Sequence, residues 1–96
     1  MDVSFILKTK KDLIISLAKK HGAYNVRVFG SASRNESGEK SDLDLLVQME
    51  EGRSQLDLIG LWQDLEEALG CKVDVITEGG ISPYLRDKIH QEAKAL

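Results

Sequence analysis

The sequence predicts an α+β fold in which a small mixed β-sheet packs against helices, in the order α-β-β-α-β-α. Long segments carry apolar residues at helical spacing, and the short segments between them are rich in β-branched residues and end at glycine or polar turns. A chain of 96 residues with 42% hydrophobic content fits one domain, since single domains commonly have about 50 to 200 residues. We therefore expect a single domain over residues 1–96, without an internal repeat or linker.

The first half of the chain predicts one helix and two strands. Residues 4–21 carry apolar side chains at near-helical spacing among several lysines, and Gly22 follows as a helix-ending residue. Residues 25–29 are rich in β-branched and aromatic side chains, and residues 42–49 alternate and then become apolar, so both segments predict strands. The polar residues 31–41 between them predict a loop.

The second half predicts two helices and one strand. Ser54 can cap a helix that ends at Gly70. Its apolar residues recur at helical spacing and predict the buried face: Leu58, Leu61, Trp62, Leu65 and Leu69. Residues 72–77 predict a third strand, and the Ser-Pro pair at residues 82–83 predicts a last helix that runs to about residue 96.

Charge and composition argue against several classes of partner. The net charge of −3 comes from 16 acidic and 13 basic residues, with no basic stripe among aromatics, so direct nucleic-acid binding is not expected. The single cysteine, Cys71, has apolar neighbours and predicts a buried thiol in a reducing compartment, which indicates the cytoplasm. The apolar run near the N-terminus is too short for a signal peptide or a membrane span of about 20 residues. No membrane role is expected.

Three aspartates are the candidate chemical groups. Successive side chains of a strand point to opposite faces, so Asp42 and Asp44 share one face of their strand. Side-by-side carboxylates repel one another, and a cation between them relieves the repulsion. Oxygen ligands of this kind suit Mg²⁺. Asp74, in the middle of the third predicted strand, could project toward the same site, and three carboxylates suffice for two metal ions about 4 Å apart.

A candidate phosphate-binding segment precedes these acids. Gly30 and Ser31 end the first predicted strand, where a glycine allows close approach of the backbone and exposed N–H groups can hold phosphate oxygens. Arg34 adds a side chain suited to bidentate phosphate contact. Each pattern alone has an ordinary explanation, because a Gly-Ser pair is usually a turn and an Asp-x-Asp pair usually begins a solvated strand. Their combination is specific.

The combined pattern resembles the nucleotidyltransferase superfamily related to DNA polymerase beta. It consists of the run at residues 28–34, the polar loop from Ser31, and the run at residues 41–47. Within the superfamily, the chain is most similar to the minimal nucleotidyltransferases, or MNT proteins, which are encoded beside HEPN-domain toxins. The resemblance covers nearly the whole chain, and it departs from the usual pattern at Asn35, where many members carry glycine.

The resemblance implies a role for each candidate residue. Gly30, Ser31 and Arg34 match the triphosphate-binding signature, whereas Asp42 and Asp44 match the metal-binding pair and Asp74 the third catalytic carboxylate. It also implies two Mg²⁺ ions, ATP as substrate, and transfer of AMP to a hydroxyl, in some systems a tyrosine, of a HEPN toxin that is thereby silenced.

Two other functions stay open at this stage. The same fold could neutralise its partner by binding alone, without catalysis. It could also be the catalytic part of a small-molecule transferase such as those acting on aminoglycosides, although those enzymes carry a further helical domain. The intact set of glycine, serine and aspartates favours an enzyme that acts as an antitoxin.

Overall fold

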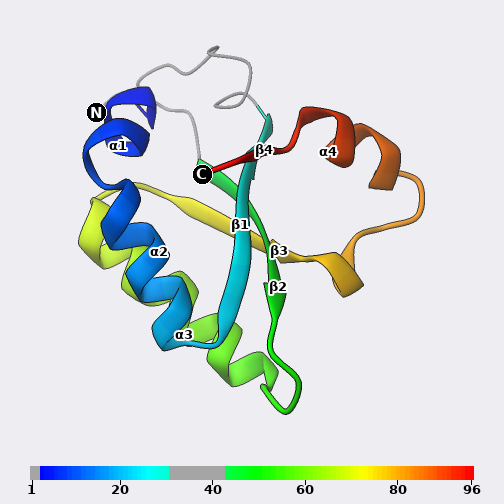
Figure 1. The fold of residues 1–96 in the computed structure, drawn as a ribbon, viewed down its shortest axis with the longest axis horizontal. Helices are drawn as coiled ribbons and strands as arrows, with labels where there is room; N and C mark the ends of the chain where they lie inside the picture. The colour runs from blue at the N-terminus through cyan, green and yellow to red at the C-terminus, as the bar shows by residue number, and fades with distance from the viewer. Residues whose placement is uncertain (1–2, 31–42) are drawn as a thin grey trace.

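The computed structural model describes residues 3–30 and 43–96 of the chain (Figure 1). Its elements, in order, are α1 (Val3–Thr9), α2 (Lys11–Lys20), β1 (Ala23–Phe29), β2 (Leu43–Met49), α3 (Gln55–Leu69), β3 (Val73–Thr77), the 3₁₀ helix η2 (Glu78–Gly80), α4 (Arg86–Glu92) and β4 (Lys94–Ala95). This is the small α+β architecture that the sequence predicted.

The strands form a mixed sheet with the order β3-β2-β1-β4. β1 pairs antiparallel with β2 on one side and with β4 on the other, whereas β2 and β3 are parallel. The parallel pair requires a crossover connection, which α3 supplies. Among the described residues, no helix is long and apolar enough to cross a membrane.

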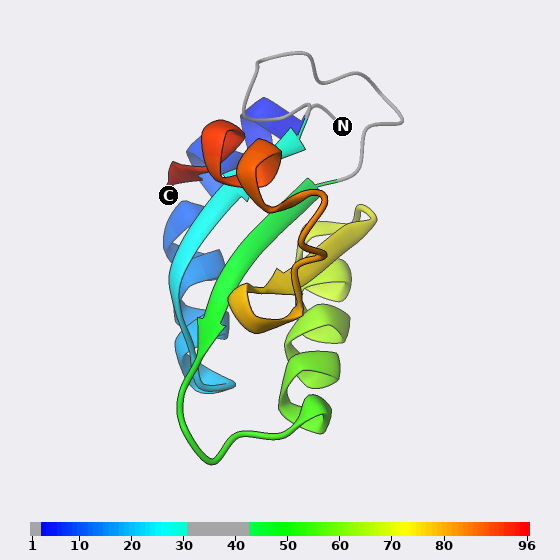
Figure 2. The ribbon, with the colours of Figure 1, turned by 90° about the vertical axis from the view of Figure 1, so that its right-hand side faces the viewer.

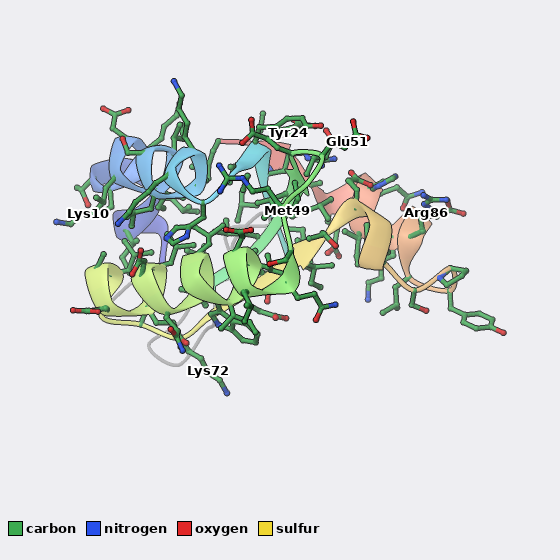
Figure 3. All side chains as sticks on the ribbon, turned by 90° about the horizontal axis from the view of Figure 1, so that it is seen from below. Lys10, Tyr24, Met49, Glu51, Lys72 and Arg86 are labelled. Carbon is green, nitrogen blue, oxygen red and sulfur yellow. The ribbon has the colours of Figure 1, made fainter. Side chains whose placement is uncertain are left out.

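The two faces of the sheet are packed differently. One face packs against α1, α2 and α3 in the larger core cluster, which includes Ile14, Leu45 and Leu65. Figure 3 shows α2 and α3 lying alongside each other. Nε2 of His21, just after α2, is 2.6 Å from Oδ2 of Asp64 in α3. The other face packs against α4 in a smaller cluster built on Phe29 and Leu46 (Figure 2).

The ends of α3 follow from local sequence signals. The Ser54 hydroxyl accepts a hydrogen bond from the Leu56 N–H, and the Asp57 carboxylate accepts one from the Ser54 N–H, which together form a capping box. Gly70 ends the helix at φ +68°, a left-handed conformation that glycine adopts at little cost. Gly22 has φ +81° just after α2, so both predicted helix ends are confirmed.

The predicted first helix is in fact two helices. The chain bends at Lys10, between α1 and α2. Ile6 and Ile14 are both buried in the larger cluster, yet eight residues along a straight helix would leave them about 80° apart in direction. The bend lets α1 and α2 each turn an apolar side toward the same core, which the periodicity alone did not indicate.

The predicted last helix is too long at both ends. Residues 82–85 form a turn in which the Leu85 N–H donates to the Ser82 carbonyl, so the proline lies in that turn instead of the first helical position. α4 ends at Glu92, and the chain continues as β4, which pairs with Arg27 and Val28 of β1. The backbone groups along the edge of β1 give this segment hydrogen-bond partners that a helix would not use.

The prediction that Trp62 packs in the core is also wrong. Its side chain is 37% exposed, whereas Leu61 and Leu65 of the same helix are fully buried. The core-facing side of α3 is therefore narrower than the apolar pattern predicted.

Candidate functional site

The first feature of the site is a pair of carboxylates on adjacent strands. Asp44 of β2 and Asp74 of β3 are direct partners in the parallel register, so their side chains leave the same face of the sheet at the same level. Both are half-buried. Their neighbours in sequence, including Leu43, Leu45 and Val73, are buried on the opposite face. The alternation of side chains along β2 and β3 buries these apolar residues and turns both acids toward the α4 side of the sheet.

Gly30 lies directly against one member of this pair, Asp44. It follows Phe29, which is paired with Asp44 across β1 and β2, and its φ of +74° is a conformation that favours glycine. A Cβ atom at Gly30 would collide with Oδ2 of Asp44. The missing side chain therefore allows the backbone to lie against the Asp44 carboxylate. Any larger residue at this position would have to displace that carboxylate.

A third carboxylate reaches the same turn from α4. The Gly30 N–H donates a hydrogen bond of 3.2 Å to Oε2 of Glu92, a half-buried residue at the end of that helix. The sequence analysis missed Glu92. It lies 62 residues from Gly30, and no local pattern marks it.

The remaining predicted site residues lie outside the described residues. They are Ser31, Arg34 and Asp42. Gly30, Asp44 and Asp74 are brought together, but their predicted roles stay predictions. Within residues 3–30 and 43–96, no group of three histidine, cysteine or acidic side chains is arranged to hold a metal ion.

A charged network holds α4 and η2 to this face of the sheet. Arg27 of β1 lies 2.5 Å from Oε1 of Glu78, and His90 of α4 lies 3.0 Å from Oε2 of the same carboxylate. Burial raises the pKa of Glu78, but the hydrogen bonds from His90 and Arg27 outweigh burial and leave this pKa below its usual value. Nη2 of Arg27 is buried and has no hydrogen-bond partner in the described part of the chain.

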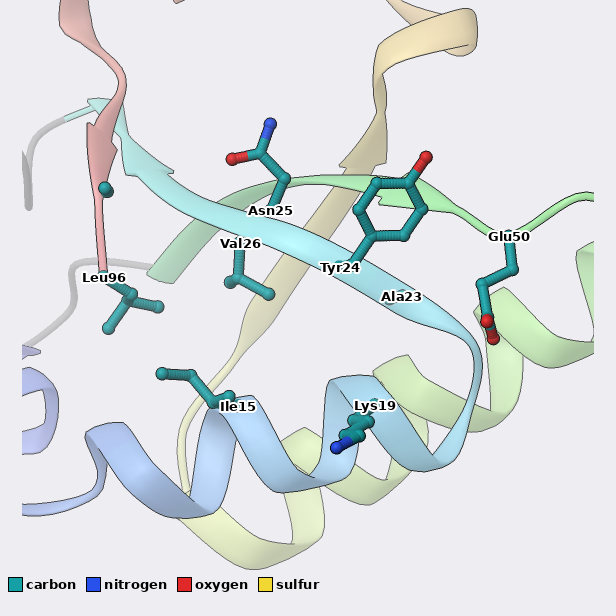
Figure 4. A pocket seen from close by; sticks show the side chains of 9 residues that line it. Ile15, Lys19, Ala23, Tyr24, Asn25, Val26, Glu50 and Leu96 are labelled. Carbon is teal, nitrogen blue, oxygen red and sulfur yellow. The ribbon is translucent and has the colours of Figure 1, made fainter.

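A cavity of about 680 Å³ lies elsewhere, between α2 and the first half of β1. Figure 4 shows Ile15, Val26 and Leu96 pointing into this space. Its lining is largely apolar and includes neither Asp44 nor Asp74. Because it offers no carboxylate pair and no glycine turn, we place the candidate chemistry at Gly30 instead.

The donor set at Gly30 fits a divalent cation. Two half-buried carboxylates on neighbouring strands repel each other, and hard oxygen atoms are the ligands that Mg²⁺ prefers. Asp44 and Asp74 are the described residues that could hold such an ion.

Comparison with known proteins identifies the class of protein that this fold and site define. Residues 7–96 match the family described as the nucleotidyltransferase domain. The chain belongs to this family, and it is a nucleotidyltransferase.

The chain is similar to archaeal proteins of the same size. It is 49% identical over 83 residues to a proposed protein adenylyltransferase of Methanocaldococcus jannaschii, covering 86% of this chain and 89% of that protein. It is 36% identical over 76 residues to the protein adenylyltransferase MntA of Thermococcus cleftensis, covering 79% of this chain and 77% of the relative.

Solved structures agree with this relationship. A structure described as a proposed minimal nucleotidyltransferase superimposes with a TM-score of 0.88 at 47% identity, covering 100% of this chain and 97% of that chain. The MNT antitoxin in complex with the tri-AMPylated HEPN toxin of Shewanella oneidensis superimposes with a TM-score of 0.71. At 22% identity, over 92% of this chain and 69% of that one, this second likeness is one of fold.

Proposed function

We propose that this protein transfers AMP from ATP to a tyrosine hydroxyl of a HEPN-domain toxin and thereby acts as its antitoxin. The observation that carries the proposal is the register pairing of Asp44 with Asp74, together with the close approach of Gly30 to Asp44. Relatives named protein adenylyltransferases support the reaction, and a fold shared with an MNT antitoxin bound to an AMPylated HEPN toxin supports the partner. We infer that the protein acts in the cytoplasm.

The proposed roles divide between two groups of residues. Gly30 allows close approach of the backbone to the triphosphate, and Ser31 and Arg34 after it bind the phosphates through a backbone N–H, a hydroxyl and a guanidinium. Asp44 and Asp74, with Asp42, would form the ligand set for two Mg²⁺ ions. When bound, these ions would offset charge on the triphosphate and lower the pKa of the attacking hydroxyl.

The transfer itself is a displacement at the α-phosphorus of ATP. The tyrosine oxygen forms a bond to this phosphorus while the bond from it to the bridging oxygen of the β-phosphate breaks, and pyrophosphate leaves. The Asp74 carboxylate orients the hydroxyl by accepting its hydrogen bond, and the proton passes to solvent. Positioning and charge stabilisation account for the catalysis, as is usual in phosphoryl transfer.

The test is the intact mass of a co-purified HEPN-domain partner after incubation with the protein, Mg²⁺ and each nucleoside triphosphate in turn. We expect mass increments of whole AMP groups with ATP, absent without Mg²⁺ and absent with an Asp74→Asn variant. Peptide mapping should place the group on a tyrosine. Modification of this chain alone, with the partner unchanged, would contradict the proposal.

Neutralisation by binding alone is the competing function. It predicts that Asp44→Asn still protects cells from the toxin and still forms the complex. The modifying function predicts that this variant forms the complex but loses protection. A growth assay with co-expressed toxin, together with gel filtration of the complex, separates the two.

A further inference from the structure

Glu92 carries a carboxylate at a helix end where the helix dipole does not favour one. It is the last residue of α4, and the partial negative charge at a helix C-terminus repels an anionic side chain. Its carboxylate also approaches Gly30, which already lies against the carboxylate of Asp44. The helix dipole therefore gives no reason for an acid at this position, whereas the Gly30 N–H gives its carboxylate a hydrogen-bond donor.

The residues that precede and follow Glu92 in the chain are both anchored to the rest of the fold. Two residues earlier, His90 is tied to Glu78, and Glu78 to Arg27 of β1. Two residues later, Lys94 pairs with Val28 near the end of β1. These anchors fix the end of α4 beside the end of β1, where the Glu92 carboxylate accepts the Gly30 N–H at 3.2 Å.

We propose that Glu92 is a positioning residue that fixes the Gly30 turn for triphosphate binding. The inference rests on the proposed function and names a residue that the sequence pattern does not include. The Gly30 turn has φ +74°, and its backbone lies against the carboxylate of Asp44. By accepting the Gly30 N–H, Glu92 keeps the glycine against Asp44 in this turn conformation.

The test compares Glu92→Ala, which removes the acceptor, with Glu92→Gln, which keeps an acceptor oxygen and removes the charge. Gln91→Ala is the matched control, because it shortens an exposed side chain in the same turn of α4. Circular dichroism and melting curves establish that each variant is folded. Three quantities are then measured on the full chain.

The first measurement is hydrogen exchange of the Gly30 amide by NMR, which reports the hydrogen bond directly. The second is the affinity of each variant for a non-hydrolysable ATP analogue with Mg²⁺. We expect Glu92→Ala to exchange Gly30 about tenfold faster and to bind the analogue about tenfold more weakly, whereas Glu92→Gln stays within about threefold of the wild type. The control should match the wild type in both.

The third measurement is the split between KM for ATP and kcat in transfer to the partner. A positioning role predicts that Glu92→Ala raises KM more than it lowers kcat, with rescue by Glu92→Gln. Tighter analogue binding by both variants would overturn the inference, because Glu92 would then be an anion that competes with the triphosphate. Unchanged Gly30 exchange and affinity in Glu92→Ala would overturn it as well.

The outcomes distinguish this inference from the proposed function. If the wild type binds the analogue and Glu92→Ala binds it equally well, the inference fails and the nucleotidyl transfer stands. If the wild type itself does not bind the analogue with Mg²⁺, the proposed function fails and the inference fails with it.

Discussion

The two faces of the sheet have different compositions and different tasks. The face covered by α1, α2 and α3 buries only apolar side chains in its cluster, with Leu61 and Leu65 fully buried. The face covered by α4 has a small apolar cluster surrounded by charged groups, including Asp44, Asp74 and the ion pair of Arg27 with Glu78. Stability is therefore concentrated on one face, which leaves the other free to hold charges that a folding core would exclude.

The largest expected effect separates chemistry from stability on the α4 face. We expect Asp44→Asn to reduce nucleotidyl transfer by about a thousandfold or more, because it removes a proposed metal ligand, while relief of repulsion with Asp74 leaves the melting temperature unchanged or raised. Transfer assays and thermal melts measure both quantities. Glu67→Gln, on the exposed side of α3, is the control. Full activity in a folded Asp44→Asn variant would refute the metal-ligand role.

The reverse effect is expected on the helix-covered face. Leu65→Ala should lower the free energy of unfolding by about 2 to 5 kcal/mol, because it leaves a cavity among fully buried side chains. Transfer activity should be retained at temperatures where the variant is folded. Leu56→Ala is the control, since this leucine is 78% exposed and should cost little. Denaturant unfolding gives both values, and equal costs for the two leucines would show that the face contributes less than its burial indicates.

Gly30→Ala tests the contact between backbone and carboxylate. The new methyl group would both occupy a left-handed conformation and collide with Asp44, so we expect nucleotide affinity to fall about tenfold or more. Gly70→Ala is matched to it, because Gly70 has φ +68° but open space at the position of the new Cβ. Both should lose about 1 to 2 kcal/mol of stability from the backbone conformation alone. A loss of affinity in both variants would remove the special role of Gly30.

The smallest expected effect is a pH dependence at the network under α4. The hydrogen bonds from His90 and Arg27 hold the folded-state pKa of Glu78 below the unfolded value of 4.5. A lowered folded pKa means that the stabilisation is fully present above pH 4.5 and is lost as the pH falls below it through the folded-state pKa. Glu78→Gln should therefore show a weaker fall of melting temperature over that range than the wild type. Parallel slopes for the two proteins would exclude this contribution.

The local parts of the fold could be read from the sequence, because the signals that form them lie within a few residues. Ser54, Asp57 and Gly70 set the ends of α3 through contacts inside one turn of helix. The strands were predicted from alternation, which also turned Asp44 away from the buried Leu43 and Leu45. A two-residue strand such as β4 has too short a pattern to be recognised, and its pairing depends on the edge of β1.

The sequence by itself determined the fold class, the glycine after the first strand, and the side of the strand on which Asp44 and Asp74 lie, because a strand has a period of two residues. Tertiary structure alone decided that β2 and β3 align Asp44 with Asp74, that Trp62 is exposed, and that Glu92 reaches Gly30. The reason is physical: register, helix rotation and contacts across 62 residues are set by how separate elements pack against one another, and no single segment contains that information.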